Sequence, residues 1–503
     1  MVAHLSRPET FGLRSGGVER VDTHISQVFL AGNRAYKLKR AVTFPYLDFS
    51  TLEKRRAACE REVQLNRRTA PDLYRAVIAV TREPGGRLTL GGGGTPVEWL
   101  VEMSRFDQRQ LLDRLATEGR LEVGTAATLG RVVARFHEFA QPRRDYGGET
   151  GIRSVVDGNL EEMIADPSGT LDPSSCHDLH ATASTSIDRL AVLLDARRLH
   201  GLVRQCHGDL HLHNVYLAAD VPTLFDCIEF NDALACIDVF YDLAFLLMDL
   251  LHRGLPAHAN AALNAYLVGR PDYGGLALLP LFLSTRAAVR SKVSVSQAEA
   301  QPDQAASTEQ RREARRYLEL AQELLRPLPP RLVAVGGLSG CGKSTLAILL
   351  APAVGPPPGA VIVRSDVVRK QMFGVELLRR LPEQAYEPEV TERVYARALH
   401  AAEAALRAGH SVVLDAVFGD ERHRAAAQRL ACAAGVPFTG LWLEAPYRIA
   451  ARRLKARSAD VSDATAAVLR RQAARDSGEI SWTRLDASGR PEETLRAARG
   501  RLA

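Results

Sequence analysis

Residues 337–344 read GLSGCGKS, a glycine-rich stretch that ends in a lysine and a serine. Glycines let successive backbone N–H groups curl around phosphate oxygens, and a helix that follows directs its positive end at the same place. In such a loop Lys343 reaches the β and γ phosphates of ATP as a catalytic group, while the Ser344 hydroxyl joins the Mg²⁺ shell. The apolar run before the stretch and the helix-like STLAILL after it favour this interpretation over a simple turn. The predicted nucleotide contacts are Gly337, Leu338, Ser339, Gly340, Cys341, Gly342, Lys343, Ser344 and Thr345.

Two aspartates that follow later strand-like runs extend this site. Asp415 in SVVLDAVF suits the carboxylate that orients Mg²⁺, and Asp366 in RSDVVRK is placed to accept the proton of an attacking hydroxyl. Both fall where a parallel strand would end, which is the edge at which open α/β sheets bind ligands. Arg369, one helical turn beyond Asp366, could hold the acceptor. Each aspartate could instead be a helix N-cap.

Arg453 and Arg457 lie four residues apart and share one face of a predicted helix. Arginines on a lid over ATP would stabilise charge on the transferred phosphoryl group. A solvated helix face is the alternative, because arginine is abundant throughout this chain.

A second set of chemical groups lies in CHGDLHLHNVYL, residues 206–217, and in the LFDCIEF that follows. His207, Asp209 and Asn214 form HxDxxxxN, and Asp226 comes later in the chain. Phosphoryl transfer needs such a set, with Asp209 to accept the proton of the acceptor hydroxyl and Asn214 and Asp226 to hold Mg²⁺ on the ATP phosphates. The histidines also permit a zinc site, but the order of Asn214 and Asp226 does not follow zinc-ligand spacing. His211 and His213 are therefore expected to be ordinary loop residues.

The same chemistry requires a lysine on an earlier strand and a glutamate on the next helix. RAYKLKR and CEREVQLN supply them, and we favour Lys37 with Glu62, while Lys39 and Glu60 remain open alternatives. WLVEM, with Glu102 and Met103, fits a hinge strand whose backbone would meet adenine.

The elements that must position these residues fall into two segments, which meet at the proline-rich linker RPLPPR, residues 326–331. After the linker, residues 331–503 alternate strand-like and helix-like runs, which predicts an α/β P-loop domain with a parallel sheet covered by helices on both faces. The predicted strands are RLVAVGG, AVIVRSD, SVVLDAVF, FTGLWLEA and ISWTRLDA. Before the linker, residues 1–105 are predicted to form β-hairpins and one helix, and residues 106–325 are mainly helical. Together they predict an α+β two-lobed, kinase-like domain.

Bulk properties restrict the classes of partner and compartment. The net charge of +6 and pI near 9.0 come from basic residues spread over many helices, so a nucleic-acid partner is not favoured. The seven cysteines include no CxxC pair, which indicates neither disulfides nor zinc and predicts a reducing cytoplasm. MVAHLSRPETFG lacks the apolar core of a signal peptide, and the most apolar stretches are too short to cross a bilayer.

The carboxy-terminal motifs, GLSGCGKS and RSDVVRK, resemble those of the small P-loop kinases, a group that includes gluconate kinase-like enzymes, zeta toxins and polynucleotide 5′-kinases. The amino-terminal set resembles the aminoglycoside phosphotransferase branch of the kinase-like fold. It departs from protein kinases in lacking GxGxxG in the first hairpin and in following Asp226 with CIE instead of Phe-Gly. The two halves in this order are similar to the bacterial family described as bifunctional aminoglycoside phosphotransferase/ATP-binding proteins.

This resemblance implies two ATP·Mg²⁺ sites that phosphorylate hydroxyl groups of small molecules. Two alternatives stay open. The amino-terminal half could be a nucleotide-dependent regulator with a degenerate kinase site, and the carboxy-terminal half could be a polynucleotide 5′-hydroxyl kinase.

Overall fold

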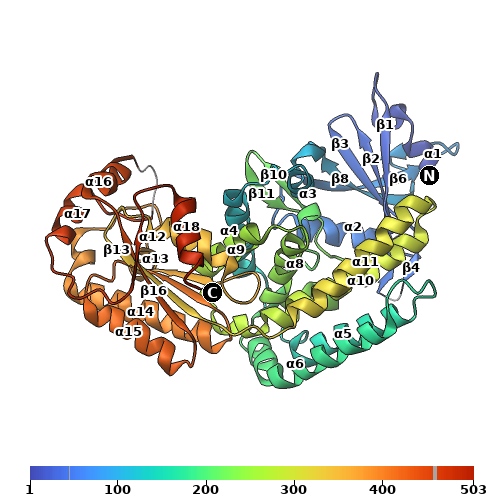
Figure 1. Cartoon of the computed structure of the whole chain (residues 1–503). Coiled ribbons are helices and arrows are strands. Elements are labelled where there is room, and N and C mark those ends of the chain that lie inside the picture. The colour runs from blue at the N-terminus through green and yellow to red at the C-terminus, as the bar shows by residue number, and fades with distance from the viewer. Residues whose placement is uncertain (45, 457–460, 503) are drawn as a thin grey trace. The chain divides into compact units, whose positions relative to one another are not determined.

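The computed structural model describes residues 1–44, 46–456 and 461–502 (Figure 1). The chain divides into two compact units. One unit, here called the kinase-like unit, comprises residues 1–167 and 173–249, and the other, the P-loop unit, comprises residues 168–172 and 250–503. The division falls within helix α8 (Val239–His252). The predicted linker lies between helix α11 (Gln304–Leu324) and strand β13 (Leu332–Gly337) of the P-loop unit.

The kinase-like unit begins with a six-stranded antiparallel sheet in the order β1-β2-β3-β8-β6-β7. Its strands are β1 (Val18–Asp22), β2 (Ser26–Ala31), β3 (Arg34–Lys39), β6 (Tyr74–Arg82), β7 (Leu88–Leu90) and β8 (Thr95–Ser104). Helix α2 (Leu52–Asn66) is capped by the Thr51 side chain and packs against β6 and β8. The predicted hairpins and the predicted helix are therefore confirmed.

The rest of this unit is mainly helical, as predicted. Its longer helices are α3 (Leu112–Thr117), α4 (Val123–Phe139), α5 (Gly148–Ile164), α6 (Pro173–Leu199) and the first part of α8. Short strands interrupt them, with β9 (Val203–Gln205) paired to β12 (Cys236–Asp238) and β10 (Val215–Ala218) paired to β11 (Val221–Leu224). The smaller elements are α1 (Val2–Leu5), β4 (Thr43–Phe44), β5 (Leu47–Asp48) and α7 (Asp232–Ala235). The HxDxxxxN segment joins β9 to β10.

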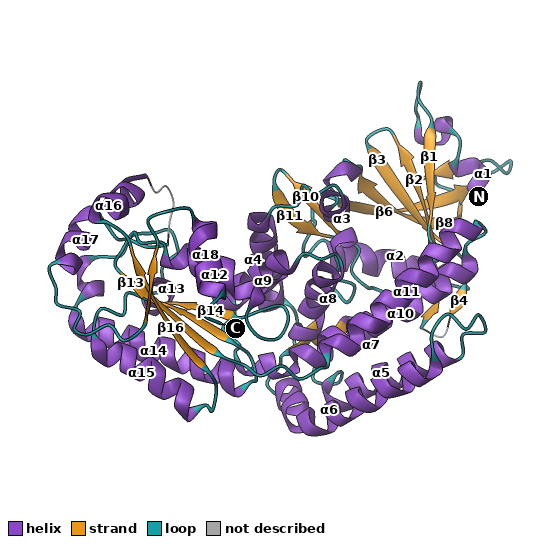
Figure 2. Cartoon of the chain, viewed as in Figure 1, coloured by secondary structure: helices purple, strands orange, loops and turns teal. Residues whose placement is uncertain are grey.

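The P-loop unit contains a five-stranded parallel sheet in the order β14-β15-β13-β16-β17. Figure 2 shows strands of this sheet in orange among purple helices. Besides β13, its strands are β14 (Val361–Arg364), β15 (Val412–Asp415), β16 (Phe438–Glu444) and β17 (Thr483–Asp486). Each overlaps one of the predicted strands, so the predicted α/β fold is confirmed. Helices α12 (Lys343–Leu350) and α18 (Pro491–Arg499) lie on one side of this sheet, and α14 (Pro388–Arg407) and α15 (Glu421–Ala433) lie on the other (Figure 1). Three further α-helices follow β13 in the sequence: α13 (Ser365–Met372), α16 (Tyr447–Ala456) and α17 (Ala466–Ala473).

Three helices precede this sheet in the same unit: α9 (Pro256–Gly269), α10 (Leu279–Ala300) and α11. Helices α10 and α11 pack against each other, and α9 packs against edge strand β14. The amide nitrogens of Asn260 and Asn264 donate to the backbone oxygen of Ala360, at 3.0 and 3.2 Å. The side-chain oxygen of Asn264 accepts from the backbone N–H of Ile362, at 2.6 Å. Two side chains of α9 thus satisfy backbone groups at the open edge of the sheet, where a further strand would otherwise bind.

Across the three stretches that the structure describes, no helix is both long enough and apolar enough to span a bilayer.

Candidate active sites

The HxDxxxxN segment brings the predicted base and one predicted metal ligand into contact. The amide nitrogen of Asn214 donates to the Asp209 carboxylate at 2.8 Å and to the Asp209 backbone oxygen at 3.0 Å. Asn214 is buried, whereas the Asp209 side chain is 38% exposed and so stays open to an acceptor. The backbone N–H of Phe225 donates to the backbone oxygen of Asn214 at 3.1 Å, and Asp226 is the next residue after Phe225.

The strand lysines and the helix glutamate meet in one network of charged side chains. Lys37 contacts Glu62 at 2.9 Å and Asp226 at 2.6 Å. Lys39 contacts the other oxygen of Glu62 at 2.6 Å and forms a short ion pair with Glu229. Burial alone would raise the pKa of Glu62, but the charges of Lys37 and Lys39 outweigh it and lower that pKa to about 2. The favoured Lys37 and its alternative Lys39 therefore bind the same glutamate. Of these two lysines, Lys37 is the one that also contacts the predicted metal ligand Asp226.

The other amino-terminal candidates lie elsewhere. Glu60 pairs with Arg56 on the exposed surface of α2. The Glu102 carboxylate pairs with Arg34, and both Glu102 and Met103 are paired with β3 and β6 within the sheet. The chain leaves the sheet only after Ser104, so a contact between adenine and the backbone of Glu102 or Met103 stays a prediction.

Helix α8 supplies two buried aspartates that sequence reasoning did not select. Asp242 accepts from the backbone N–H groups of His207 and Gly208, at 3.1 and 2.8 Å. Asp249, seven residues on, accepts from the N–H of Leu212 at 3.0 Å. Together they fix the backbone of the loop that carries Asp209. An aspartate buried within the apolar run YDLAFLLMDLL was the available signal, because such a residue needs a hydrogen-bond partner.

The histidines of this loop have structural partners. His207 is fully buried and bonds the Phe225 oxygen at 2.9 Å, and burial lowers its pKa. His211, expected to be an ordinary loop residue, lies 3.3 Å from the Asp209 carboxylate. His213 contacts Asp113 at 2.7 Å. A metal-like grouping of His137, Cys206 and Asp242 also occurs, but Asp242 is already engaged by His137 and by the loop backbone.

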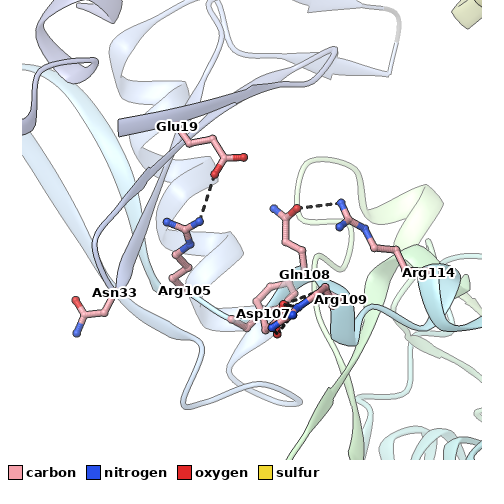
Figure 3. Close-up of a pocket in the computed structure, with 8 residues that line it drawn as sticks. Glu19, Asn33, Arg105, Asp107, Gln108, Arg109 and Arg114 are labelled. Atoms are coloured by element: carbon pink, nitrogen blue, oxygen red, sulfur yellow. Dashed lines mark hydrogen bonds and ion pairs between the residues drawn. The ribbon is translucent and has the colours of Figure 1, made fainter. Parts of the chain in front are cut away.

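A pocket of about 500 Å³ lies beside the residues that come directly after β8 (Figure 3). It is lined by Glu19, Asn33, Arg105, Phe106, Asp107, Gln108, Arg109 and Arg114. Arg105 pairs with Glu19, Arg109 with Asp107, and Arg114 donates to Gln108 (Figure 3). Arg105 and Arg109 are thus paired with carboxylates, whereas Arg114 binds a neutral amide oxygen. The ring of Phe106, which also lines the pocket, stacks on the ring of Tyr216, with ring centroids 4.4 Å apart.

The phosphate-binding loop of the P-loop unit has the backbone that its sequence requires. Gly337 has φ +132°, and a Cβ there would lie 2.5 Å from the Leu443 oxygen, so no other residue fits. Gly342 has φ +99° with open space beside it, and α12 starts at the next residue. The first N–H groups of that helix have no acceptor within it and form an anion-binding end. Lys343 donates to the Leu338 oxygen at 3.0 Å.

The predicted Mg²⁺ ligands of this unit are in direct contact. The Ser344 hydroxyl donates to the buried Asp415 carboxylate at 2.6 Å. Arg364, which the sequence did not single out, donates to the Ser344 oxygen at 3.1 Å and lies 3.3 Å from the same carboxylate oxygen. Carboxylate and hydroxyl oxygens suit Mg²⁺, as do the carboxylate and amide oxygens of Asp226 and Asn214 in the other unit. Both donor sets fit this ion.

The proton-accepting and acceptor-binding candidates lie on α13. Burial raises the pKa of Asp366, with a smaller contribution in the same direction from the charge of Asp415. Arg369 is buried, donates to the Ala385 oxygen and to the Thr391 hydroxyl, and lies 4.8 Å from the Tyr386 ring. Its guanidinium group is therefore anchored within the unit, and a contact between Arg369 and the acceptor stays a prediction.

The structure describes one of the two arginines that were predicted to lie on a lid over ATP. Arg453 donates to the backbone oxygens of Ala487 and Gly489, at 2.7 and 2.9 Å, so it is anchored to the loop after β17. Arg457 lies outside the described residues. A contact to the phosphate loop comes instead from Gln472 on α17, whose side-chain oxygen accepts from the Ser339 N–H at 2.9 Å. Nothing in the sequence around Gln472 distinguished it from its neighbours.

Comparisons with known proteins match both halves of the chain. The model of the phosphotransferase enzyme family matches residues 43–279, and an AAA domain model matches residues 332–477.

Solved structures of kinases resemble the chain at low identity. A choline/ethanolamine kinase family protein from Mesorhizobium loti is 15% identical, with 64% of this chain and 97% of that chain covered and a TM-score of 0.40. A sugar kinase from Janibacter is 22% identical, covering 35% of this chain and 95% of its own, with a TM-score of 0.28. The Mycobacterium tuberculosis APS kinase is 21% identical, covering 35% and 99%, with a TM-score of 0.26.

Relatives of nearly full length occur in mycobacteria. Uncharacterized proteins of Mycobacterium tuberculosis and Mycobacterium bovis are 32% identical over 485 residues, which is 94% of this chain and 93% of theirs. The chain belongs to the same family as these mycobacterial proteins, and it joins a domain of the phosphotransferase enzyme family to a P-loop kinase domain.

Proposed function

We propose that the protein is an ATP-dependent phosphotransferase with two ATP·Mg²⁺ sites, one in each unit, and that each site phosphorylates a hydroxyl group of a small molecule. The observation that supports this proposal is that, in each unit, the aspartate predicted to be the base lies near a separate pair of residues predicted to bind Mg²⁺. In the kinase-like unit Asp209 contacts Asn214 next to Asp226. In the P-loop unit Asp366 lies within the field of Asp415 and Lys343, beside the Ser344–Asp415 contact.

In the kinase-like unit, Asp209 accepts the proton of the acceptor hydroxyl as that oxygen attacks the γ phosphorus. Asn214 and Asp226 would hold Mg²⁺, which neutralises charge on the ATP phosphates. Lys37 is oriented by Glu62 and lies next to Asp226, where its ammonium group can bind phosphate oxygens. Asp242 and Asp249 keep the loop of Asp209 in place through its backbone.

In the P-loop unit, the loop backbone and Lys343 bind the phosphates, and Ser344 and Asp415 would hold the metal. Asp366 removes the proton from the acceptor, and its raised pKa makes it a stronger base than an ordinary aspartate. Arg369 positions the acceptor one helical turn away. We also propose a reducing cytoplasm as the working compartment, because all seven cysteines are free thiols.

The alternative for the kinase-like unit is a nucleotide-dependent regulatory domain. It is favoured by the first hairpin, in which THISQVFL stands where protein kinases have glycines that grip phosphate. For the P-loop unit the alternative acceptor is the 5′-hydroxyl of a polynucleotide.

The test is Mg²⁺-dependent ADP release from the full chain with pooled sugars, aminoglycosides, nucleosides and 5′-hydroxyl oligonucleotides. Wild type, Asp209→Asn and Lys343→Met are compared, with Asp188→Asn as a control on an exposed side chain. We expect acceptor-dependent release that is lost in one of the two site variants and kept in the control. Release that no acceptor stimulates, or that both site variants retain, contradicts the proposal. Loss in Lys343→Met with oligonucleotides alone selects the polynucleotide kinase.

A further inference from the structure

Arg364 lies between the two residues expected to hold Mg²⁺ in the P-loop unit. It is the last residue of β14, and its side chain is only 18% exposed. One guanidinium nitrogen donates to the Ser344 oxygen at 3.1 Å, and another lies 3.3 Å from the Asp415 carboxylate. The guanidinium group thus bridges a hydroxyl and a carboxylate that are themselves 2.6 Å apart.

The sheet register produces this arrangement. Strands β14 and β15 are parallel neighbours, and Arg364 is the register partner of Asp415. Both residues end their strands, so their side chains leave the same edge of the sheet next to the phosphate-binding loop. The contact is therefore set by strand pairing rather than by the conformation of a surface loop.

Charge explains what Arg364 does there. Asp415 is 4% exposed, and a buried carboxylate requires a nearby cation. Arg364 supplies that cation when no metal is bound. A divalent cation bound to the same two oxygens would meet the guanidinium charge at close range, and like charges in a poorly solvated site repel strongly.

We propose that Arg364 and Mg²⁺ bind Ser344 and Asp415 in competition, so that metal binding displaces the Arg364 side chain. This inference rests on the proposed function of the P-loop unit. Before nucleotide arrives, Arg364 keeps the two metal ligands in position. Its guanidinium group is also a donor for phosphate oxygens, which guanidinium groups bind with two parallel hydrogen bonds.

Removing Arg364 then has two opposite effects. Metal-free ATP loses a cationic partner and binds more weakly. Mg²⁺ loses a competitor and binds the nucleotide-loaded site more tightly. A residue that only supported the fold would weaken both when removed, so the opposite signs distinguish competition from structural damage.

The experiment uses the full chain with Asp226→Asn, which silences the metal site of the other unit. In this background Arg364→Met and Arg364→Lys are compared with unchanged Arg364 and with Arg484→Met, a control whose side chain is 56% exposed on β17. Binding of ATP is measured by calorimetry in EDTA and across a Mg²⁺ titration, and bound Mn²⁺ is counted by electron paramagnetic resonance. Thermal unfolding shows that each variant is folded.

For Arg364→Met we expect the metal concentration at half-saturation to fall by about 5- to 150-fold, the usual range of coupling between two sites, with weaker binding of metal-free ATP. Arg364→Lys keeps the positive charge but loses the planar guanidinium group. Its affinities for metal and for metal-free ATP should lie between those of the protein with Arg364 and those of Arg364→Met. Unchanged or weaker metal binding in both folded variants overturns the inference. If the protein with Arg364 intact binds no nucleotide in either condition, the proposed function fails and the inference fails with it.

Discussion

The two candidate sites place similar chemical groups by different means. In the kinase-like unit, the charged groups come from a strand, a helix and a loop, and Lys39 and Glu229 meet although 190 residues separate them. In the P-loop unit, the residues from Gly337 at the end of β13 to Ser344 at the start of α12 are consecutive in the chain, and Asp415 and Arg364 end neighbouring strands of one sheet. The first site depends on tertiary packing of distant segments, whereas the second depends mainly on local backbone geometry and strand register.

This difference also appears in how charge is handled. Lys37 and Lys39 keep Glu62 ionised in the interior of the kinase-like unit, with its pKa lowered to about 2. In the P-loop unit, burial raises the pKa of Asp366, because the carboxylate lies in a poorly solvated place. The ion pairs of the first site order its charged side chains, and burial in the second site raises the basicity of the predicted base Asp366. Substitutions in each unit should reflect these roles.

The largest effects should come from removing one metal carboxylate in each unit. Asp226→Asn and Asp415→Asn should each lower phosphoryl transfer in their own unit by about 10²–10³-fold, because a charge that stabilises the transition state is lost. Transfer in the other unit should be unchanged. The measurement is the rate of ADP release with the acceptor assigned to each unit. Parallel losses in both units from either variant would show that the two sites do not act independently.

The buried ion pairs can be tested by stability. Lys39→Met leaves Glu229 and one oxygen of Glu62 without their cation, and should lower the free energy of unfolding of the kinase-like unit by about 3–5 kcal/mol. Adding Glu229→Leu should restore most of the loss, because the unpaired carboxylate is then gone. Hydrogen exchange of β3 and α2 during urea unfolding reports the effect.

The exposed pair of Arg484 and Glu444 in the P-loop unit is the control, and Arg484→Met should change stability by no more than about 1 kcal/mol. A small effect of Lys39→Met, or no recovery in the double variant, would remove the distinction between the two units.

Acid should destabilise the P-loop unit through His410. The buried ring of His410 bonds the backbone oxygen of Gly359. Burial lowers the pKa of His410 from the usual 6.5 to about 4. Between those values the unfolded chain takes up a proton that the folded unit does not. Stability is therefore complete above pH 6.5 and falls as the pH drops toward 4, by about 2 kcal/mol at pH 5. Urea unfolding at pH 8 and pH 5 measures this loss, and His410→Gln should reduce it. An equal loss in the variant would assign the acid sensitivity to other groups.

The smallest effect concerns the edge of the P-loop sheet. Asn264→Ala removes the acceptor of the Ile362 N–H and one donor to Ala360, and should lower the stability of this unit by about 1 kcal/mol. Hydrogen exchange at Ile362 should rise more than exchange in β16, which lies inside the sheet. Unchanged exchange at Ile362 would show that α9 does not protect the edge.

The sequence was sufficient to predict those parts of the fold and of the candidate sites that depend on residues adjacent in the chain. GLSGCGKS predicts its own loop, and each apolar run before a candidate aspartate of the P-loop unit became a strand. It was insufficient where the partner is distant. The sequence alone could not show that Lys37 and Lys39 share Glu62, that Asp242 and Asp249 bind the loop of Asp209, or that Arg364 faces Asp415. Such contacts follow from strand register and helix packing, which no local spacing encodes.

Helix α9 lies within the residues that match the phosphotransferase family, yet its asparagines bind Ala360 and strand β14 of the P-loop sheet. Ribosomes make this helix about a hundred residues before that strand, so the partner of the sheet edge is already present when β14 emerges. A fragment that starts at residue 331 would instead present β14 as a bare edge, which is a template for pairing between chains. The segment that matches the phosphotransferase family thus supplies the cover for the edge of the P-loop sheet, and we expect a P-loop fragment without α9 to aggregate more readily.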